Sequence, residues 1–246
     1  MPSLQERCEQ AQEQLIAMRY LDAEATLFRV EQEALRTRDW DALARLYMPL
    51  QEARRQRRQR CGEGIFRLDL LALKPDERLD PERLVEQYPI GQLLVAGLGT
   101  IEPAVRLRKL AAERKLYLET FLAAVYPIEG SIAIVIVPLD DSPLPDARPR
   151  TLDRLRSELP PDCLILHRGE VPSGPHKGTY ETYGKAMSFW ERLHAPFLAA
   201  ADRLPDPIQR IEAYRQTIRV DYACELAHQK LSDVARNLAR SAVAMG

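Results

Sequence analysis

Apolar residues recur at helical spacing at both ends of the chain. The segment from Leu4 to Arg60 contains no glycine, and its apolar side chains return every three or four residues, as one face of an amphipathic helix requires. The break between two such stripes falls at Arg38-Asp39, where Asp39 is suited to cap the next helix. Pro49 is expected to bend or interrupt that helix. The same pattern from Tyr180 onward predicts helices at the C-terminal end as well.

The middle of the chain alternates between strand and helix patterns. Strands are predicted at four apolar segments: Ile65–Leu70, Leu93–Ala96, Ile132–Val137 and Cys163–Leu166. Helices are predicted over Thr100–Val125, over Thr151–Leu159 and at Asp80-Pro81, where Asp80 is suited as the N-cap and Pro81 as the first helical residue. The run Ile132–Val137 is apolar on both faces, which is typical of a central strand covered by helices on both sides.

This alternation predicts an α/β fold with a mostly parallel, four-stranded sheet. Helical hairpins are expected to flank the sheet at both ends. We therefore divide the chain into an N-terminal helical region (1–62), an α/β core (63–178) and a C-terminal helical region (179–246).

The helical ends resemble tetratricopeptide repeats. Trp40-x-x-Leu43-Ala44-x-x-Tyr47 is similar to the first-helix half of that motif. The second-helix half of an earlier repeat is matched by Tyr20, Ala23, Leu27 and Val30. Near the C-terminus, Tyr214-x-x-Thr217-Ile218-x-x-Asp221 resembles the end of a repeat, and Leu231 begins another. The resemblance implies surfaces for protein partners. The alternative is that ordinary amphipathic hairpins pack on the sheet.

Charge and cysteine content give no sign of a membrane or nucleic-acid protein. The 35 basic residues are balanced by 36 acidic ones, so no global field attracts nucleic acid or acidic lipid. The four cysteines form no C-x-x-C pair and follow no secretory leader, which suits a reducing compartment. The longest apolar stretch, Ser131–Leu139, is too short to cross a bilayer. We expect a cytoplasmic protein without a membrane anchor.

Two motifs favour simple structural interpretations. Gly97-Leu98-Gly99-Thr100 follows a strand and precedes a helix, but Glu102 occupies the place of the third glycine of a dinucleotide-binding loop. We interpret it as a tight turn. The run Arg54–Arg60 could contact phosphates, yet its arginines fan around a helix axis near a helix end, where cations are stabilising. Nucleic-acid binding is therefore not expected.

The strongest candidate for a ligand site lies after the fourth strand, because open parallel sheets bind ligands at carboxyl ends of strands. The candidate residues are Arg168, His176, Lys177, Tyr180, Tyr183 and, after the third strand, Asp140. A phosphate or carboxylate could bind there; the alternative is an ordinary polar connection. No metal site, cofactor or catalytic residue is indicated by the spacing of the histidines, cysteines and carboxylates.

The sequence favours a non-catalytic interaction or scaffold protein that binds a protein partner. The alternative is an α/β ligand-binding protein or enzyme acting on a small anionic compound. That alternative requires Gly97, Asp140 and the segment 168–183 to meet at one pocket.

Overall fold

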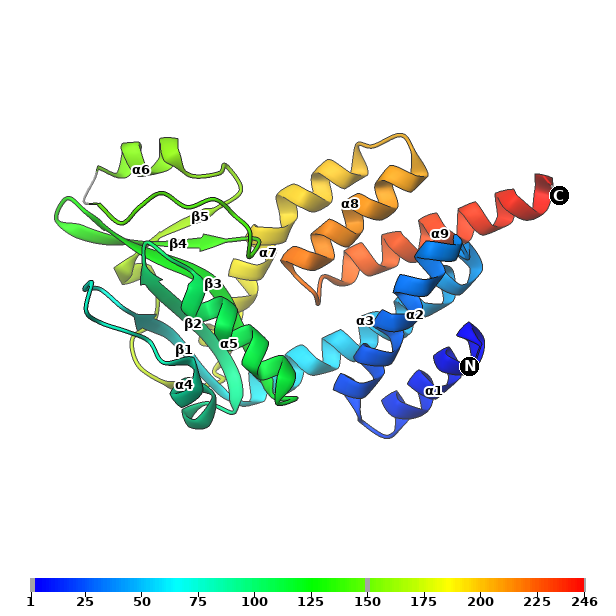
Figure 1. Cartoon of the computed structure of the whole chain (residues 1–246), viewed down its shortest axis with the longest axis horizontal. Helices are drawn as coiled ribbons and strands as arrows, with labels where there is room; N and C mark the ends of the chain where they lie inside the picture. Colours follow the sequence, from blue (N-terminus) through cyan, green and yellow to red (C-terminus); the bar gives the residue numbers. More distant parts are fainter. Residues whose placement is uncertain (1–2, 149–150, 246) are drawn as a thin grey trace. The chain divides into compact units, whose positions relative to one another are not determined.

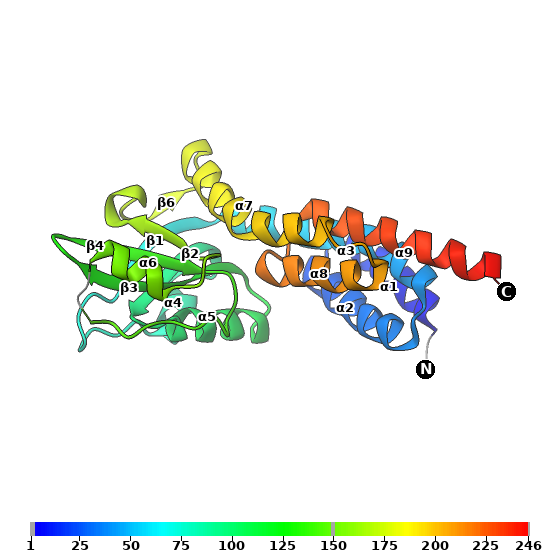
Figure 2. The ribbon, with the colours of Figure 1, turned by 90° about the horizontal axis from the view of Figure 1, so that it is seen from above.

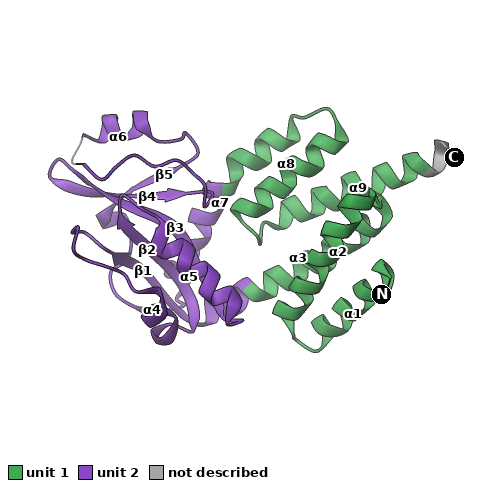
Figure 3. Cartoon of the chain, viewed as in Figure 1, with its two compact units in different colours: residues 1–57, 194–246 green, residues 58–193 purple. Residues whose placement is uncertain are grey.

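The computed structural model describes residues 3–148 and 151–245, and the chain divides into two compact units (Figures 1 and 3). The helical unit comprises Met1–Arg57 and His194–Gly246, and the sheet unit comprises Arg58–Leu193. The long helices α3 (Trp40–Glu63) and α7 (Tyr180–Asp202) each contribute residues to both units. The predicted borders at 62 and 178 thus lie within the sheet unit, whose ends are at 58 and 193.

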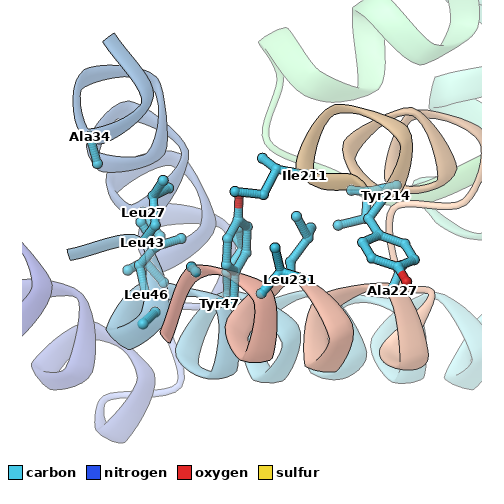
Figure 4. Packing of buried hydrophobic residues seen from close by; sticks show 14 of the residues in the cluster. Leu27, Ala34, Leu43, Leu46, Tyr47, Ile211, Tyr214, Ala227 and Leu231 are labelled. Atoms are coloured by element: carbon cyan, nitrogen blue, oxygen red, sulfur yellow. The ribbon is translucent and has the colours of Figure 1, made fainter. Parts of the chain in front are cut away.

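The helical unit is built from both ends of the chain. Its other helices are α1 (Leu4–Ile16), α2 (Tyr20–Thr37), α8 (Pro207–Val220) and α9 (Glu225–Met245). One apolar cluster joins them: Leu27 of α2, Leu46 and Tyr47 of α3, Ile211 of α8 and Leu231 of α9 all belong to it (Figure 4). The helices from the two ends therefore share one core.

The connection between α2 and α3 follows the sequence-based expectation. Asp39 Oδ1 accepts a hydrogen bond from the backbone N–H of Ala42 at 2.9 Å, which confirms Asp39 as the N-cap of α3. Pro49 lies inside α3, and the helix continues to Glu63, so the expectation of an interruption at Pro49 is wrong.

The sheet has six strands of mixed direction, in the order β5-β4-β3-β2-β1-β6. The strands are β1 (Ile65–Leu71), β2 (Ile90–Leu98), β3 (Tyr117–Ile128), β4 (Ser131–Val137), β5 (Leu164–His167) and β6 (His176–Lys177). Strands β1, β2 and β3 are parallel to one another. Strand β4 runs antiparallel to β3, β5 runs antiparallel to β4, and β6 runs antiparallel to β1. The predicted four-stranded, mostly parallel sheet is therefore wrong, although the mixed α/β class is confirmed.

The predicted helix over Thr100–Val125 is a helix followed by a strand. Helix α5 (Glu102–Glu113) ends in a left-handed turn at Lys115 (φ 52°), and the N–H of Leu116 bonds back to the carbonyl of Ala111. Strand β3 then pairs with β2 and β4 and lies at the centre of the sheet. Ile132–Val137, expected to be central, forms β4 next to the edge strand β5.

Helices cover both faces of the sheet. Apolar residues of α4 (Pro81–Gln87), α5 and α6 (Leu152–Glu158) pack with Leu93, Leu122 and Val135 on one face. Helix α7 lies on the other face (Figure 2). There Phe121 of β3 contacts Phe189 and Trp190 of α7, with the indole stacked at a centroid distance of 4.3 Å. Among the described residues, none of the helices combines the length and apolar character needed to cross a membrane.

Glycine is required where β1 and β2 begin to pair. A Cβ atom on Gly91 would lie 2.1 Å from the carbonyl oxygen of Ile65. Ile65 and Gly91 are paired in the β1–β2 ladder, so moving a side chain cannot relieve this clash. We expect Gly91→Ala to destabilise the sheet unit by about 2 kcal/mol. Gly169→Ala is the control, since a Cβ there meets nothing within 4 Å. Equal urea midpoints for the two variants would contradict this account.

Candidate interaction pocket and the predicted site residues

A surface pocket of about 590 Å³ lies within the helical unit, where the α2–α3 connection faces the end of α9. Its lining comes from two segments: Arg38, Asp39, Trp40, Asp41 and Ala44 on one side, and Arg236, Ala239, Arg240 and Ala242 on the other. The pocket thus combines an indole and small apolar side chains with charged groups.

The α2–α3 connection places its residues at the pocket by local backbone rules. Arg38 ends α2 in the left-handed conformation (φ 54°), and its N–H bonds to the carbonyls at the end of that helix. Asp39 caps α3, so Trp40 is the first residue of the new helix. The Trp40 side chain remains partly exposed although neighbouring Leu43 is fully buried.

The charges of the pocket are unequally neutralised. Asp41 pairs with Arg45, and Arg236 pairs with Asp233 at 3.0 Å. Asp39 is engaged as a helix cap. Arg38 and Arg240, in contrast, form no ion pair with any residue in 3–148 or 151–242. Two exposed guanidinium groups therefore remain available at the pocket.

The arginine run in α3 is largely neutralised by carboxylates inside the protein. Arg54 and Arg57 both bind Glu24 of α2, at 3.1 and 2.9 Å. Arg58 donates two hydrogen bonds to Glu119 Oε1, at 3.0 and 2.6 Å. The remaining pairs lie along the helix: Arg55 with Glu52, and Arg60 with Glu63. These pairs reduce the charge available for contacts with phosphates.

Two histidines of the helical unit have opposite electrostatic surroundings. Burial of His228 and repulsion by Arg54 lower its pKa to about 3; its Nε2 lies 3.1 Å from Arg54 Nη1. Burial also lowers the pKa of His194, but interactions with Asp221 and Cys224 outweigh it and raise the pKa to about 9. His194 Nδ1 lies 2.7 Å from Asp221 Oδ2. His228 is therefore neutral and His194 cationic at neutral pH.

Some of the predicted site residues lie in or next to residues 168–175, the connection from β5 to β6, which we call the strap. Asp69 of β1 fixes the strap: its Oδ2 accepts a hydrogen bond from the N–H of Gly174 at 2.8 Å and lies 3.4 Å from Arg168 Nη2. His176 Nε2 contacts the carbonyl of Ser173 at 2.9 Å, and Arg168 Nη2 contacts the hydroxyl of Ser173 at 3.4 Å. The strap thus groups Arg168 and His176 around Ser173.

The other residues of the predicted site are less closely connected. Lys177 lies opposite Ile65 in the β1–β6 pair and is exposed. Tyr183 packs edge-on against Phe66 at a centroid distance of 6.2 Å, whereas the side chain of Tyr180 is 97% exposed. The structure shows no interaction that joins these side chains to Arg168 among the residues it describes.

Asp140 and the glycine turn lie at opposite ends of the strands. Strand β4, which precedes Asp140, runs antiparallel to β3 and therefore to β2, which precedes Gly99. The end of β5 before Arg168 lies at the same end of the strands as Gly99, because β5 is parallel to β2 and β3. Asp140 therefore does not join the other two regions around one pocket.

The glycine turn itself is closed by the protein. The N–H of Gly97 bonds to the carbonyl of Thr100 at 3.1 Å, and the N–H of Gly99 bonds to Val125 at 3.0 Å. A Cβ on Gly99 (φ 64°) would lie 2.9 Å from the backbone nitrogen of Ala147, so the connection between β4 and α6 covers this turn. Both features support the interpretation as a tight turn.

The sequence analysis missed Asp69 and the residues of the pocket. Asp69 occupies a polar position in an alternating strand, a pattern that normally indicates a solvent-facing side chain. Arg38 follows α2 and Arg240 belongs to α9, and these helices lie near opposite ends of the sequence, which therefore indicates nothing of their proximity. The match of Trp40 to a repeat motif does not indicate the surface that its side chain lines.

Within 3–148 and 151–245, no group of three or more histidine, cysteine, aspartate or glutamate residues could hold a metal ion. No protein-family model, no curated protein and no solved structure matches the chain.

Proposed function

We propose that the protein is a non-catalytic interaction protein and that its helical unit carries the partner site. The observation that supports this proposal is the pocket lined by Trp40, Arg38 and Arg240, which is open at the protein surface. Aromatic and arginine side chains are the residue types that contribute most to protein–protein binding. The tetratricopeptide-like pattern around Trp40 agrees with this role.

The alternative function, binding of a small anionic compound at the strand ends, has weaker support. It needs Gly97, Asp140 and the segment 168–183 at one pocket, and the strand directions place Asp140 at the opposite end of the strands from Gly97 and Arg168. Asp69 also satisfies part of the hydrogen-bonding capacity of the strap.

Filling the pocket is expected to abolish partner binding. Ala239→Phe places a bulky ring at the wall of the pocket, whereas Asn237→Phe adds the same ring to an exposed position of α9 that does not line it. Both tagged full-length variants and the wild type are used to capture proteins from a lysate of the source cells. We expect specific proteins with the wild type and Asn237→Phe, and their loss with Ala239→Phe.

Circular dichroism and thermal melting must first show that both variants are folded. Retention of every captured protein by Ala239→Phe would exclude this pocket as the partner site. Capture of no specific protein by the wild type would count against the interaction function as a whole.

A further inference from the structure

We propose that the pocket binds an acidic segment of a partner protein in which two carboxylates flank an apolar side chain. This inference rests on the proposed interaction function and specifies the chemistry of the partner. It follows from three features of the pocket: its unpaired cations, its small apolar residues and the strained backbone of Arg38.

The first feature is the pair of guanidinium groups. Arg38 and Arg240 lie at the same pocket, and neither is neutralised within the part of the chain that the structure describes. A guanidinium binds a carboxylate with two parallel hydrogen bonds, which are stronger than those between neutral groups. Two such groups from two different helices favour a partner segment with two acidic residues.

The second feature is the apolar part of the lining. Ala44, Ala239 and Ala242 are small, so they leave space beside Trp40. An indole face and methyl groups stabilise an apolar side chain by removing it from water. We infer that a side chain such as leucine enters between the two charged contacts.

The third feature is the backbone of Arg38. Its φ of 54° is unfavourable for any residue with a Cβ atom, and glycine is the usual residue at this place after a helix. Glycine would relieve this strain and retain the turn. Met18 and Lys115 adopt the same conformation outside the pocket, so the strain at Arg38 supports a binding role through its combination with the unpaired charge at the pocket.

An acidic protein segment fits the pocket better than a nucleic acid does. The lining contains one aromatic residue, Trp40, whereas strand-binding proteins stack successive bases on several.

The direct test uses a short labelled peptide and the full-length protein. The probe is fluorescein-labelled Gly-Ser-Glu-Leu-Glu-Ser-Gly with blocked ends, and binding is followed by fluorescence anisotropy. Replacing both glutamates by glutamine, or the leucine by serine, should weaken binding about tenfold, because each removes one of the proposed contacts. A labelled uridine octamer, the nucleic-acid alternative, should bind more weakly than the peptide.

Charge-reversal variants connect the probe to the pocket. Arg38→Glu and Arg240→Glu should each weaken binding at least tenfold. Arg36→Glu is the matched control, because Arg36 is exposed on the same helix as Arg38 and does not line the pocket. Equal affinities for all three variants, or tighter binding of the uridine octamer, would overturn the proposal.

Arg38→Gly separates binding from stability. It should weaken peptide binding, yet raise the folding equilibrium constant of the helical unit about fivefold, since glycine adopts this backbone without strain. Met18→Gly is the control: Met18 also has a positive φ (57°), but it lies outside the pocket. It should stabilise the protein and leave binding unchanged. Loss of stability with unchanged binding in Arg38→Gly would contradict the role proposed for Arg38.

The results also distinguish this inference from the proposed function. If Ala239→Phe abolishes capture of partners while Arg38→Glu and Arg240→Glu do not, the pocket binds proteins but the acidic chemistry is wrong. If Ala239→Phe has no effect, both proposals fail at this pocket.

Discussion

Replacing Glu119 by glutamine is expected to destabilise the sheet unit by about 3 kcal/mol or more. Glu119 and Arg58 form an ion pair whose side chains are 4% and 9% exposed. The variant removes the carboxylate charge that accepts two hydrogen bonds from the buried Arg58 guanidinium, and removing one member of a buried pair typically costs about 3–5 kcal/mol. Arg58 also lies over the Trp190 ring at 4.7 Å, but this contact cannot replace the lost carboxylate charge.

The chain offers a convenient measurement, because its two tryptophans lie in different units. Trp40 belongs to the helical unit and Trp190 to the sheet unit. In protein labelled with 5-fluorotryptophan, urea unfolding followed by fluorine NMR reports on each unit through its own resonance. We expect Glu119→Gln to lower the midpoint seen at Trp190 more than the midpoint seen at Trp40.

A double variant provides the control for this prediction. Arg58→Met with Glu119→Leu removes both charges and keeps apolar volume, so most of the lost stability should return. A loss below about 1 kcal/mol for Glu119→Gln would contradict the account and indicate that solvent reaches the pair.

Local signals in the sequence predict many elements but not the strand pairing. Asp39 and Asp80 cap helices as expected, because a side-chain cap depends on residues within one turn. The direction of β4 depends on the Glu129-Gly130 hairpin turn between β3 and β4. Since Leu118–Val125 was assigned to a helix, this hairpin could not be predicted. Apolar residues that fill both faces of an interior strand give no clear period.

The same limit applies to the candidate sites. Arg168 and His176 are near each other in sequence, and both contact Ser173 in the structure. The pocket, in contrast, joins the α2–α3 connection to α9, and this depends on the core that both ends of the chain share. Long-range packing of this kind leaves no local pattern, so composition and motifs could not reveal it.

The helical unit is expected to be most stable near pH 6.5 and to lose stability in both directions. The folded protein holds the proton of His194 up to about pH 9, whereas an unperturbed histidine releases it near 6.5. The contribution of His194 to the free energy of unfolding is therefore complete below pH 6.5 and is lost as the pH rises through about 9. The shift corresponds to roughly 3 kcal/mol at most, and solvent screening reduces this value.

His228 acts in the opposite direction. Its folded pKa of about 3 lies below the unperturbed value of 6.5, so the unfolded chain takes up a proton that the folded protein refuses. Its contribution is complete above pH 6.5 and is lost as the pH falls toward 3. Arg54 faces the ring, with Asp221 and Glu24 acting less strongly in the opposite sense. Carboxylates such as Glu24 add to the loss only below about pH 4.5.

The two histidines can be separated by substitution, with urea midpoints read at the Trp40 resonance from pH 4.5 to 9.5. His194→Gln should lower stability at pH 6.5 and reduce the loss of stability at alkaline pH, because Asp221 then loses its contact with the cationic imidazole of His194. His228→Gln should flatten the acid limb between pH 6.5 and 4.5, since an amide oxygen can still accept from Arg54 but takes up no proton. If both variants keep the wild-type profile, the pH dependence arises from other groups. If each variant removes the pH dependence on its own side of pH 6.5, these two histidines set the pH range in which the helical unit, and the pocket that it carries, is most stable.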